Sequence, residues 1–239
     1  MDENQLDTFI YSNLKDMGKT KFLSFYKGTY ASDELHKVHI RNFKKPACFT
    51  FIVNTLKRKS PKNAMGHWLC LAVKLKPETR TLNIKFLDSF KNPYQTYGAC
   101  SKYIDRLRIM AFDKGFTFKI ENAPHMLQAY GSKVCGAYCC YAILKLKNCN
   151  ENTLKNIFSK FDRNNRKNND FLIGEFVSKN WPLKYCTDVF TKSGVPPFCP
   201  KKVYNHPRCL PKCGCKHKCC KKPKSKGYIR QTIARLLFI

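Results

Sequence analysis

The sequence predicts a protein of the α+β class, and three observations support this prediction. Short apolar segments typical of strands lie between residues 47 and 121. Segments with apolar residues at helical spacing come before and after them. The chain has 239 residues, of which 43% are apolar and 13% aromatic, so it can fill the core of one ordinary domain with a short appendage.

The first half of the chain predicts one helix and three strands. The helix has its apolar residues at helical spacing and can end at Gly18; these residues are Leu6, Phe9, Ile10, Leu14 and Met17. Residues 47–55 are typical of a buried strand. Residues 67–75 and 81–90 predict two strands of a hairpin, because "KPETR" at residues 76–80 has turn chemistry.

The second half predicts four helices and one strand before the composition changes. An amphipathic helix is expected around residues 103–111, and a strand at residues 116–121. An apolar helix is expected to open at Cys135. Two further helices are expected at residues 152–161 and 170–181, the last with Asp170 as its capping residue.

The net charge of +29 indicates the kind of partner. Such a charge attracts DNA, RNA or an acidic membrane surface, whereas the alternative is a generally solvated basic surface.

No run of eighteen apolar residues is present, so no membrane span is expected. The start, "MDENQLDTFIYSNL", lacks the pattern of a secretory signal. In a chain without such a signal the fourteen cysteines should be mostly reduced, which favours nucleophiles or metal ligands.

Cys135 stands where a nucleophile is expected. It follows the polar loop "YGSK" and opens an apolar helix, whose N-terminus stabilises a thiolate. Gly136 has no side chain and permits the close approach of a substrate backbone. Cys139 and Cys140 lie one turn further along and are expected to be small core residues.

Three other residues complete a catalytic arrangement with Cys135. His67 begins one predicted strand and Asp88 ends the next, so a hairpin would place them side by side, with the acid fixing the tautomer of the base. Gln128 lies seven residues before Cys135 and can donate to a developing oxyanion together with the Cys135 backbone N–H. Each residue also has a purely structural interpretation: a strand-edge histidine, a turn cap and a surface amide.

These motifs together resemble those of the adenovirus-type cysteine proteases (adenain), and more distantly the SUMO-deconjugating proteases of the same clan. The matching segments are "FLSFYKGTY", "IVNT", "GHWLCLAV", "FLDSF" and "QAYGSKVCGAYCC", and the resemblance covers about residues 5–184. It implies an α+β papain-related fold, with a mixed central β-sheet flanked by helices and the catalytic Cys at the N-terminus of a buried helix. It also implies a thiol endopeptidase that matures viral capsid precursors, usually at small, glycine-containing sites.

The resemblance assigns a role to each residue. Cys135 takes the place of the nucleophile, His67 of the general base, Asp88 of the orienting acid and Gln128 of the oxyanion donor. Adenovirus enzymes usually carry Glu at the third position, and Asp is the choice of the SUMO-protease branch.

Adenovirus enzymes are activated by DNA and by a peptide that can be disulfide-linked upstream of the active site, but "KGFTFKIE" at residues 114–121 has no cysteine for such a link. DNA, and a peptide without that link, are the expected activators, and the chemistry requires no cofactor.

The chain divides into an expected protease domain, residues 1–190, and a basic Cys-rich tail, residues 191–239. No Asp or Glu occurs from Val189 to Ile239, whereas Lys and Arg together number thirteen. Contact with phosphates is therefore the expected role of the tail. Residues 229–239, "IRQTIARLLFI", have one apolar helical face and suggest a built-in activating peptide.

The tail is also rich in soft metal ligands. Cys209, Cys213, Cys215, His217, Cys219 and Cys220, with Cys199 and His206 nearby, can hold Zn²⁺. Their irregular spacing leaves two alternatives, a disulfide cluster and an unliganded tail.

The first functional hypothesis is thus a viral maturation endopeptidase, expected to be a monomer in the host nucleus and the virion. Its substrates would be capsid and core precursor polypeptides, and DNA its partner. The second hypothesis is a deubiquitinating or deSUMOylating isopeptidase. The third is a nucleic-acid-binding structural protein with an inactive protease fold.

Overall fold

The computed structural model describes residues 1–61, 64–147 and 152–181. A five-stranded sheet with strand order β1-β2-β3-β4-β5 forms its centre. The strands are β1 (Tyr26–Ala31), β2 (Ala47–Asn54), β3 (Trp68–Lys76), β4 (Thr81–Leu87) and β5 (Thr117–Asn122). The pairs β2–β3 and β3–β4 are antiparallel, whereas β1–β2 and β4–β5 are parallel. The expected mixed sheet is therefore confirmed.

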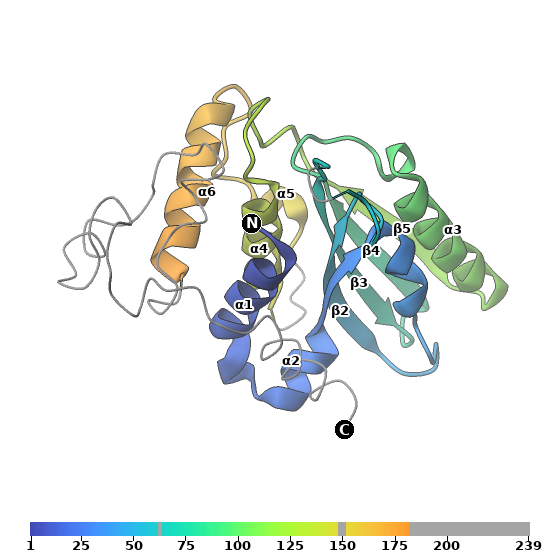
Figure 1. The fold of residues 1–239 in the computed structure, drawn as a ribbon. Coiled ribbons are helices and arrows are strands. Elements are labelled where there is room, and N and C mark those ends of the chain that lie inside the picture. The colour runs from blue at the N-terminus through green and yellow to red at the C-terminus, as the bar shows by residue number, and fades with distance from the viewer. Residues whose placement is uncertain (62–63, 148–151, 182–239) are drawn as a thin grey trace.

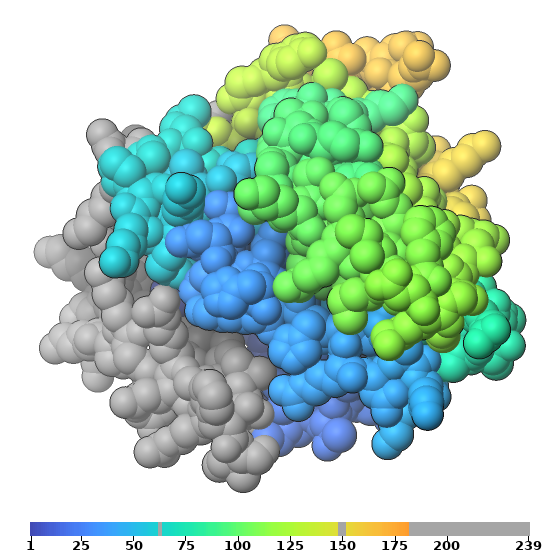
Figure 2. All heavy atoms as spheres, turned by 90° about the vertical axis from the view of Figure 1, so that its right-hand side faces the viewer, coloured from blue at the N-terminus to red at the C-terminus, as the bar shows by residue number. Residues whose placement is uncertain are grey.

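Helices cover both faces of the sheet (Figure 1). On one face lie α1 (Glu3–Leu14), α4 (Cys135–Lys145) and α6 (Arg166–Asn180), with the short helices α2 (Lys19–Phe25) and α5 (Leu154–Ile157) nearby. On the other face lies α3 (Gly98–Asp113). Figure 2 faces α3, against which the residues after the 3₁₀ helix η2 (Ser32–Lys37) pack, and Arg106 donates to the Val38 carbonyl at 3.2 Å. Two shorter 3₁₀ helices are η1 (Lys15–Met17) and η3 (Tyr94–Thr96).

The alternation of side chains along the strands creates two cores. Ile52 and Cys70 point toward α1 and α4, whereas their neighbours Phe51, Val53 and Leu71 point toward α3. This period-two alternation follows from strand geometry, and it buries apolar side chains on both faces. The sheet is consequently a rigid support from whose ends functional side chains can project.

The buried position of α4 places the first residue of this helix at the edge of the sheet. All residues of α4 from Cys135 to Ile143 are buried, between the sheet and the helices α1 and α6. The expectation of a cysteine at the N-terminus of a buried helix is confirmed. No helix within the described ranges has the length and apolar character needed to cross a membrane.

Three details differ from the sequence-based expectations. The parallel edge strand β1 and helix α2 were not predicted, because "YKGTYA" shows no clear apolar alternation. Helix α6 begins at Arg166 and is capped by Asn165, whose side chain accepts from the Asn168 N–H. Asp170 is therefore not the helix cap; it lies buried inside α6. The predicted boundary between residues 190 and 191 lies outside the described residues.

Candidate active site

The β3–β4 hairpin brings His67 and Asp88 together. His67 directly precedes β3 and Asp88 directly follows β4, and these strands pair with Cys70 opposite Leu87. The His67 Nε2 and the Asp88 Oδ1 are 2.7 Å apart. The His67 backbone is held as well, because its N–H donates to the Thr55 hydroxyl at 2.9 Å. The predicted proximity of the two side chains is confirmed, and it follows from the hairpin alone.

Cys135 lies on the other side of the imidazole. It is the first residue of α4 and is 8% exposed. It lies beside the His67 imidazole, and each of the two groups shifts the pKa of the other. Since the Nε2 of His67 faces Asp88, the Nδ1 is the nitrogen left for the thiol. Cys135, His67 and Asp88 thus lie together in the order that nucleophilic catalysis by a thiol requires, with a hydrogen bond between His67 and Asp88.

The mutual interactions of these three groups favour their charged forms. Burial alone would lower the pKa of His67, but the hydrogen bonds and charges of Asp88 and Cys135 raise it to about 9. Burial would raise the pKa of Cys135, but hydrogen bonding to His67 and the His67 charge hold it below its ordinary value. Burial would raise the pKa of Asp88, but the hydrogen bonds from His67, the Phe90 N–H and Tyr97, together with the His67 charge, lower it. With the thiol pKa lowered and the imidazole pKa raised, these interactions favour a thiolate–imidazolium pair.

The other described free cysteines have the opposite electrostatic environment. Burial raises the pKa of Cys70 and of Cys100 to about 12. It also raises the pKa of Cys139 and of Cys140 well above the ordinary range. All four are buried core thiols, as predicted for Cys139 and Cys140, and Cys48 is disulfide-bonded. Among the free cysteines that the structure describes, Cys135 alone has a lowered pKa.

Asp88 is held in place by donors that the sequence analysis did not identify. The Phe90 N–H donates to Oδ1 at 2.9 Å, the Asn92 N–H to Oδ2 at 3.0 Å, and the Tyr97 hydroxyl to Oδ2 at 2.8 Å. These bonds fix the orientation of the carboxylate while its Oδ1 faces His67. Tyr97 reaches Asp88 only because the chain turns after β4 and passes through η3, a path that no local pattern in the sequence reveals.

Gln128 is buried beside the same turn, and two serines fix its amide. Its Oε1 accepts from the Ser89 hydroxyl at 2.6 Å, and its Nε2 donates to the Ser132 carbonyl at 2.6 Å. An amide nitrogen has two N–H groups, so one remains for another acceptor. Within the described residues, the backbone N–H groups of Cys135 and Gly136 donate to no backbone carbonyl outside α4. These N–H groups at the start of α4 are suited to an oxyanion.

The loop that carries Gln128 is anchored by α6. Asp170 accepts from the Ala129 N–H at 3.2 Å and from the Tyr138 hydroxyl at 3.0 Å. The neighbouring Asn169 donates to the Leu127 carbonyl at 3.1 Å. The role of Asp170 is thus to hold the loop before Cys135, across about forty residues of sequence. A sequence pattern cannot reveal such a long-range contact.

A row of aromatic rings leads away from the imidazole. The His67 and Phe90 ring centres are 5.1 Å apart, and those of Phe90 and Tyr130 are 6.2 Å apart with nearly parallel planes. Tyr130 is 76% exposed, and the Arg166 guanidinium lies 5.9 Å from its ring centre. This aromatic row, His67–Phe90–Tyr130, presents an apolar surface with a positive end directly beside the candidate site.

Gly136 is needed for packing. A Cβ at this position would lie 3.0 Å from the Leu6 Cδ2 and 3.3 Å from the Trp68 Cδ1. The Trp68 indole also donates to the Met1 carbonyl at 3.0 Å, so the start of the described chain packs against the site. The absence of a side chain thus allows Leu6 and Trp68 to pack closely against the first turn of α4.

The candidate zinc ligands of the tail (Cys209, Cys213, Cys215, His217, Cys219 and Cys220, with Cys199 and His206) lie outside the described residues. Within the described ranges, no group of three or more His, Cys, Asp or Glu side chains is placed to hold a metal ion. The zinc hypothesis therefore stays a prediction.

Comparison with known proteins gives weak similarities. No family model matches the chain, and neither does any curated protein. Among solved structures, the chain is similar to the ASFV pS273R protease, with 15% identity and a TM-score of 0.44, over 72% of this chain and 65% of that one. It is also similar to a de-sumoylating protease, with 14% identity and a TM-score of 0.40, over 74% of this chain and 78% of that one.

A third similar structure is the Legionella pneumophila effector protein RavZ, with 11% identity and a TM-score of 0.35, over 76% of this chain and 73% of that one. The chain spans about two thirds of the length of the ASFV protease. At these scores the similarities do not assign a function. The functional interpretation therefore rests on the site geometry.

Proposed function

We propose that this protein is a cysteine endopeptidase. The observation that carries the proposal is that Cys135, the first residue of a buried helix, interacts with His67, whose imidazole is hydrogen-bonded to Asp88. The electrostatics agree with this role, because the pKa of the thiol is lowered and that of the imidazole is raised to about 9. Shifts of pKa that arise from specific charge partners are typical of functional sites.

The reaction follows from this geometry. The Cys135 thiolate attacks the scissile carbonyl, and the tetrahedral oxyanion accepts hydrogen bonds from Gln128 and from backbone N–H groups at the start of α4. The His67 imidazolium protonates the leaving amine, and water then hydrolyses the acyl-enzyme with His67 as general base. Asp88 orients the imidazole and stabilises its charge.

The position of His67 also distinguishes the two sides of the substrate. The leaving amine must lie within reach of the imidazole that protonates it. The residues that follow the scissile bond therefore run past His67, toward Phe90 and Tyr130. The aromatic row is accordingly assigned to the leaving-group side of the substrate.

We further propose the biological setting that the sequence motifs suggest: cleavage of capsid and core precursor proteins during maturation of a virus. The support is the resemblance of "GHWLCLAV", "FLDSF" and "QAYGSKVCGAYCC" to adenovirus-type proteases. The net charge of +29 supports DNA as a partner and stimulator of the reaction. An enzyme of this kind would act as a monomer in the host nucleus and the virion.

The alternative enzyme is an isopeptidase that removes ubiquitin or SUMO. Asp88, in place of Glu, favours this branch. The same catalytic residues would serve both reactions, so the distinction lies in the substrate. The other alternative, a binding protein with an inactive fold, is disfavoured by the paired Cys135 and His67.

The test uses the full-length protein and a library of peptides derived from a proteome digest. Mass spectrometry should find new peptide termini that share a residue pattern around the cleaved bond, and the Cys135→Ala variant should produce none. A parallel reaction with SUMO- and ubiquitin-conjugated lysine measures isopeptidase activity. Cleavage of conjugates without cleavage of peptides would overturn the endopeptidase proposal, and cleavage of neither would favour the inactive fold.

A further inference from the structure

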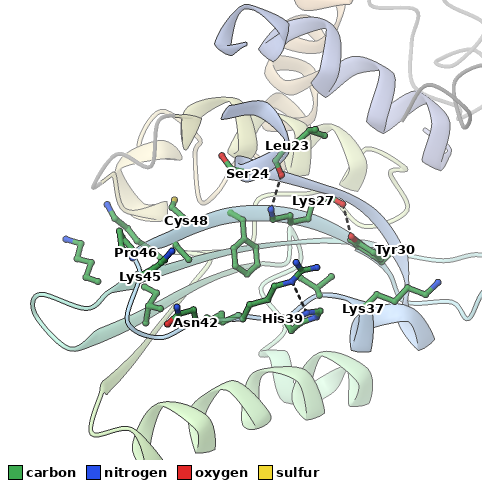
Figure 3. Close-up of a pocket in the computed structure, with 18 of the residues that line it drawn as sticks. Leu23, Ser24, Lys27, Tyr30, Lys37, His39, Asn42, Lys45, Pro46 and Cys48 are labelled. Carbon is green, nitrogen blue, oxygen red and sulfur yellow. Dashed lines mark hydrogen bonds between the residues drawn. The ribbon is translucent and has the colours of Figure 1, made fainter. Parts of the chain in front are cut away.

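A basic groove lies at the end of the sheet opposite the candidate active site. Its cavity has a volume of about 1020 Å³, and its walls come from α2, β1, the loop before β2, the start of β2 and the end of β3. The cations that line it are Lys27, Lys37, Arg41, Lys45, Lys74 and Lys76, whereas Glu78 is the one carboxylate among the described residues of the lining. Figure 3 shows Lys27, Lys37, His39 and Lys45 around this groove.

The groove is separate from the catalytic residues. Strand β3 begins at Trp68 beside His67 and ends at Lys76 in the groove, with Leu75 opposite Ala47 at that end. A strand rises about 3.3 Å per residue, so the two ends of β3 are about 26 Å apart. No catalytic residue lines the groove. The groove is therefore not a subsite for the residues that flank the scissile bond.

Three of its cations lack a carboxylate partner in the part of the chain that the structure describes. Lys37 forms an ion pair with Glu34, with 2.7 Å between the Nζ and the Oε1. Within residues 1–61, 64–147 and 152–181, no carboxylate lies within ion-pair distance of Lys27, Arg41 or Lys45. Positive charges close to one another repel, and this repulsion is relieved by an external anion.

Lys27 shows how closely the cations are placed. The residue is half-buried, and its Nζ donates to the Leu23 carbonyl at 2.9 Å and lies 5.8 Å from the centre of the Phe49 ring. Burial and then the charge of Arg41 lower its pKa. An ammonium group with three N–H donors retains donors for a ligand oxygen. An anion bound between Lys27 and Arg41 would neutralise both charges.

We propose that this groove binds the phosphodiester backbone of a nucleic acid. A strand that carries a negative charge on every nucleotide can neutralise cations contributed by several separate segments, as β1 and residues 38–46 contribute them here. The chain's own tail is not complementary, because from Val189 onward it has thirteen Lys or Arg and no acid. A polyanion, in contrast, is complementary in charge to both the groove and this basic segment.

The inference gives a location to the nucleic-acid partner of the proposed function, and it does not require peptidase activity. An acidic segment of a protein is the competing occupant. It would use the same cations through carboxylates, so the experiment must separate the two.

The experiment measures binding of a short fluorescent single-stranded DNA to the full-length protein by anisotropy at several salt concentrations. The test variant is Lys27→Gln/Arg41→Gln/Lys45→Gln. The matched control is Lys102→Gln/Lys119→Gln/Lys167→Gln, which removes the same charge from exposed positions that do not line the groove. Because Lys27 is half-buried, the double variant Arg41→Gln/Lys45→Gln repeats the test with exposed residues alone. Alkylation of Cys135 checks that each variant retains its fold.

We expect the triple groove variant to bind DNA at least tenfold more weakly than the control variant. The slope of log K against log salt should fall by about 2, since each lost contact with a single strand removes about 0.7. Equal loss in the groove and control variants would overturn the proposal, because binding would then follow overall charge. Tighter binding of poly-glutamate than of DNA, lost in the groove variants, would assign the groove to an acidic protein segment and would also overturn it.

Discussion

The two ends of β3 differ in whether their charged side chains have partners of opposite charge among the described residues. At the Trp68 end, the charged forms of Cys135, His67 and Asp88 stabilise one another, and their pKa values are set by these partners inside the protein. At the Lys76 end, Lys27, Arg41 and Lys45 have no carboxylate partner among the described residues. A site that is complete in itself is suited to chemistry, whereas a site with uncompensated charge is suited to binding. The comparison predicts that a substitution at one end should reduce peptide cleavage without affecting DNA binding, and a substitution at the other end should do the reverse.

The largest difference between the effect on peptide cleavage and the effect on DNA binding should come from Cys135→Ala. Removal of the nucleophile should lower kcat on the order of 10⁶-fold, because no other described thiol has a lowered pKa. Peptide cleavage measures the loss, and DNA anisotropy should show unchanged affinity. A Cys135→Ala protein that still cleaved peptides would contradict the assignment of the nucleophile.

The second prediction concerns the stabilisation of the oxyanion by Gln128. Gln128→Ala should lower kcat about 100- to 1,000-fold, because it removes one donor to the tetrahedral intermediate. Ser89→Ala is the matched variant: it removes the bond to the Gln128 Oε1 but leaves the Nε2 donor, so its effect should be smaller. Steady-state kinetics with a cleaved peptide measures both. An equal loss in the two variants would indicate that Gln128 has only a packing role.

The pH dependence tests the ion pair itself. His67 has a raised pKa of about 9, so its proton is retained at neutral pH and lost as the pH rises through 9. Above that value cleavage should fall about tenfold per pH unit, because the leaving amine is no longer protonated. Alkylation of Cys135 should not fall with it, since the thiolate remains. A decline of cleavage centred near the ordinary histidine value of 6.5 would contradict the strong pairing.

The Asp88 anchors predict a smaller effect. Tyr97→Phe removes the 2.8 Å hydrogen bond to the Asp88 Oδ2 but keeps the ring near His67. A hydrogen bond to a charged group contributes about 1.5–3 kcal/mol, so kcat/KM should fall at least about tenfold. The high-pH limit of cleavage should also move to lower pH, because a less well held carboxylate stabilises the imidazolium less. An unchanged pH profile would show that Tyr97 supports the fold alone.

The smallest predicted effect lies on the aromatic row. Tyr130→Ala removes an exposed ring that stacks on Phe90, so KM should rise a few-fold while kcat stays nearly constant. The readout is the split between KM and kcat for peptides that differ only after the cleaved bond. Equal effects for all such peptides would remove Tyr130 from the leaving-group side.

The catalytic end was predictable from the sequence because its geometry is mostly local. The turn at residues 76–80 forms the hairpin, and this hairpin places His67 beside Asp88. Cys135 could be predicted as the opening residue of an apolar helix. The supports of the site were not predictable: Asp170 holds the Gln128 loop from α6, and Tyr97 reaches Asp88 after an irregular turn.

The groove end could not be predicted for a related physical reason. Residues 38–46 follow no helix or strand pattern, and their position depends on packing against α3. The sequence revealed the total charge of +29 but not where cations gather without carboxylates. Edge strand β1, which supplies Lys27, was also missed. Local patterns thus predicted the candidate catalytic site, whereas the groove is visible only in the three-dimensional fold.

The most direct test of the central claim is the reactivity of Cys135. Brief treatment of the reduced full-length protein with a thiol alkylator near pH 6 should label Cys135 far ahead of the other thirteen cysteines, as mapped by mass spectrometry. This lead should disappear in His67→Ala, because the imidazolium stabilises the thiolate. Labelling of Cys135 no faster than that of the buried Cys139 or Cys140, or a lead that survives in His67→Ala, would contradict the account.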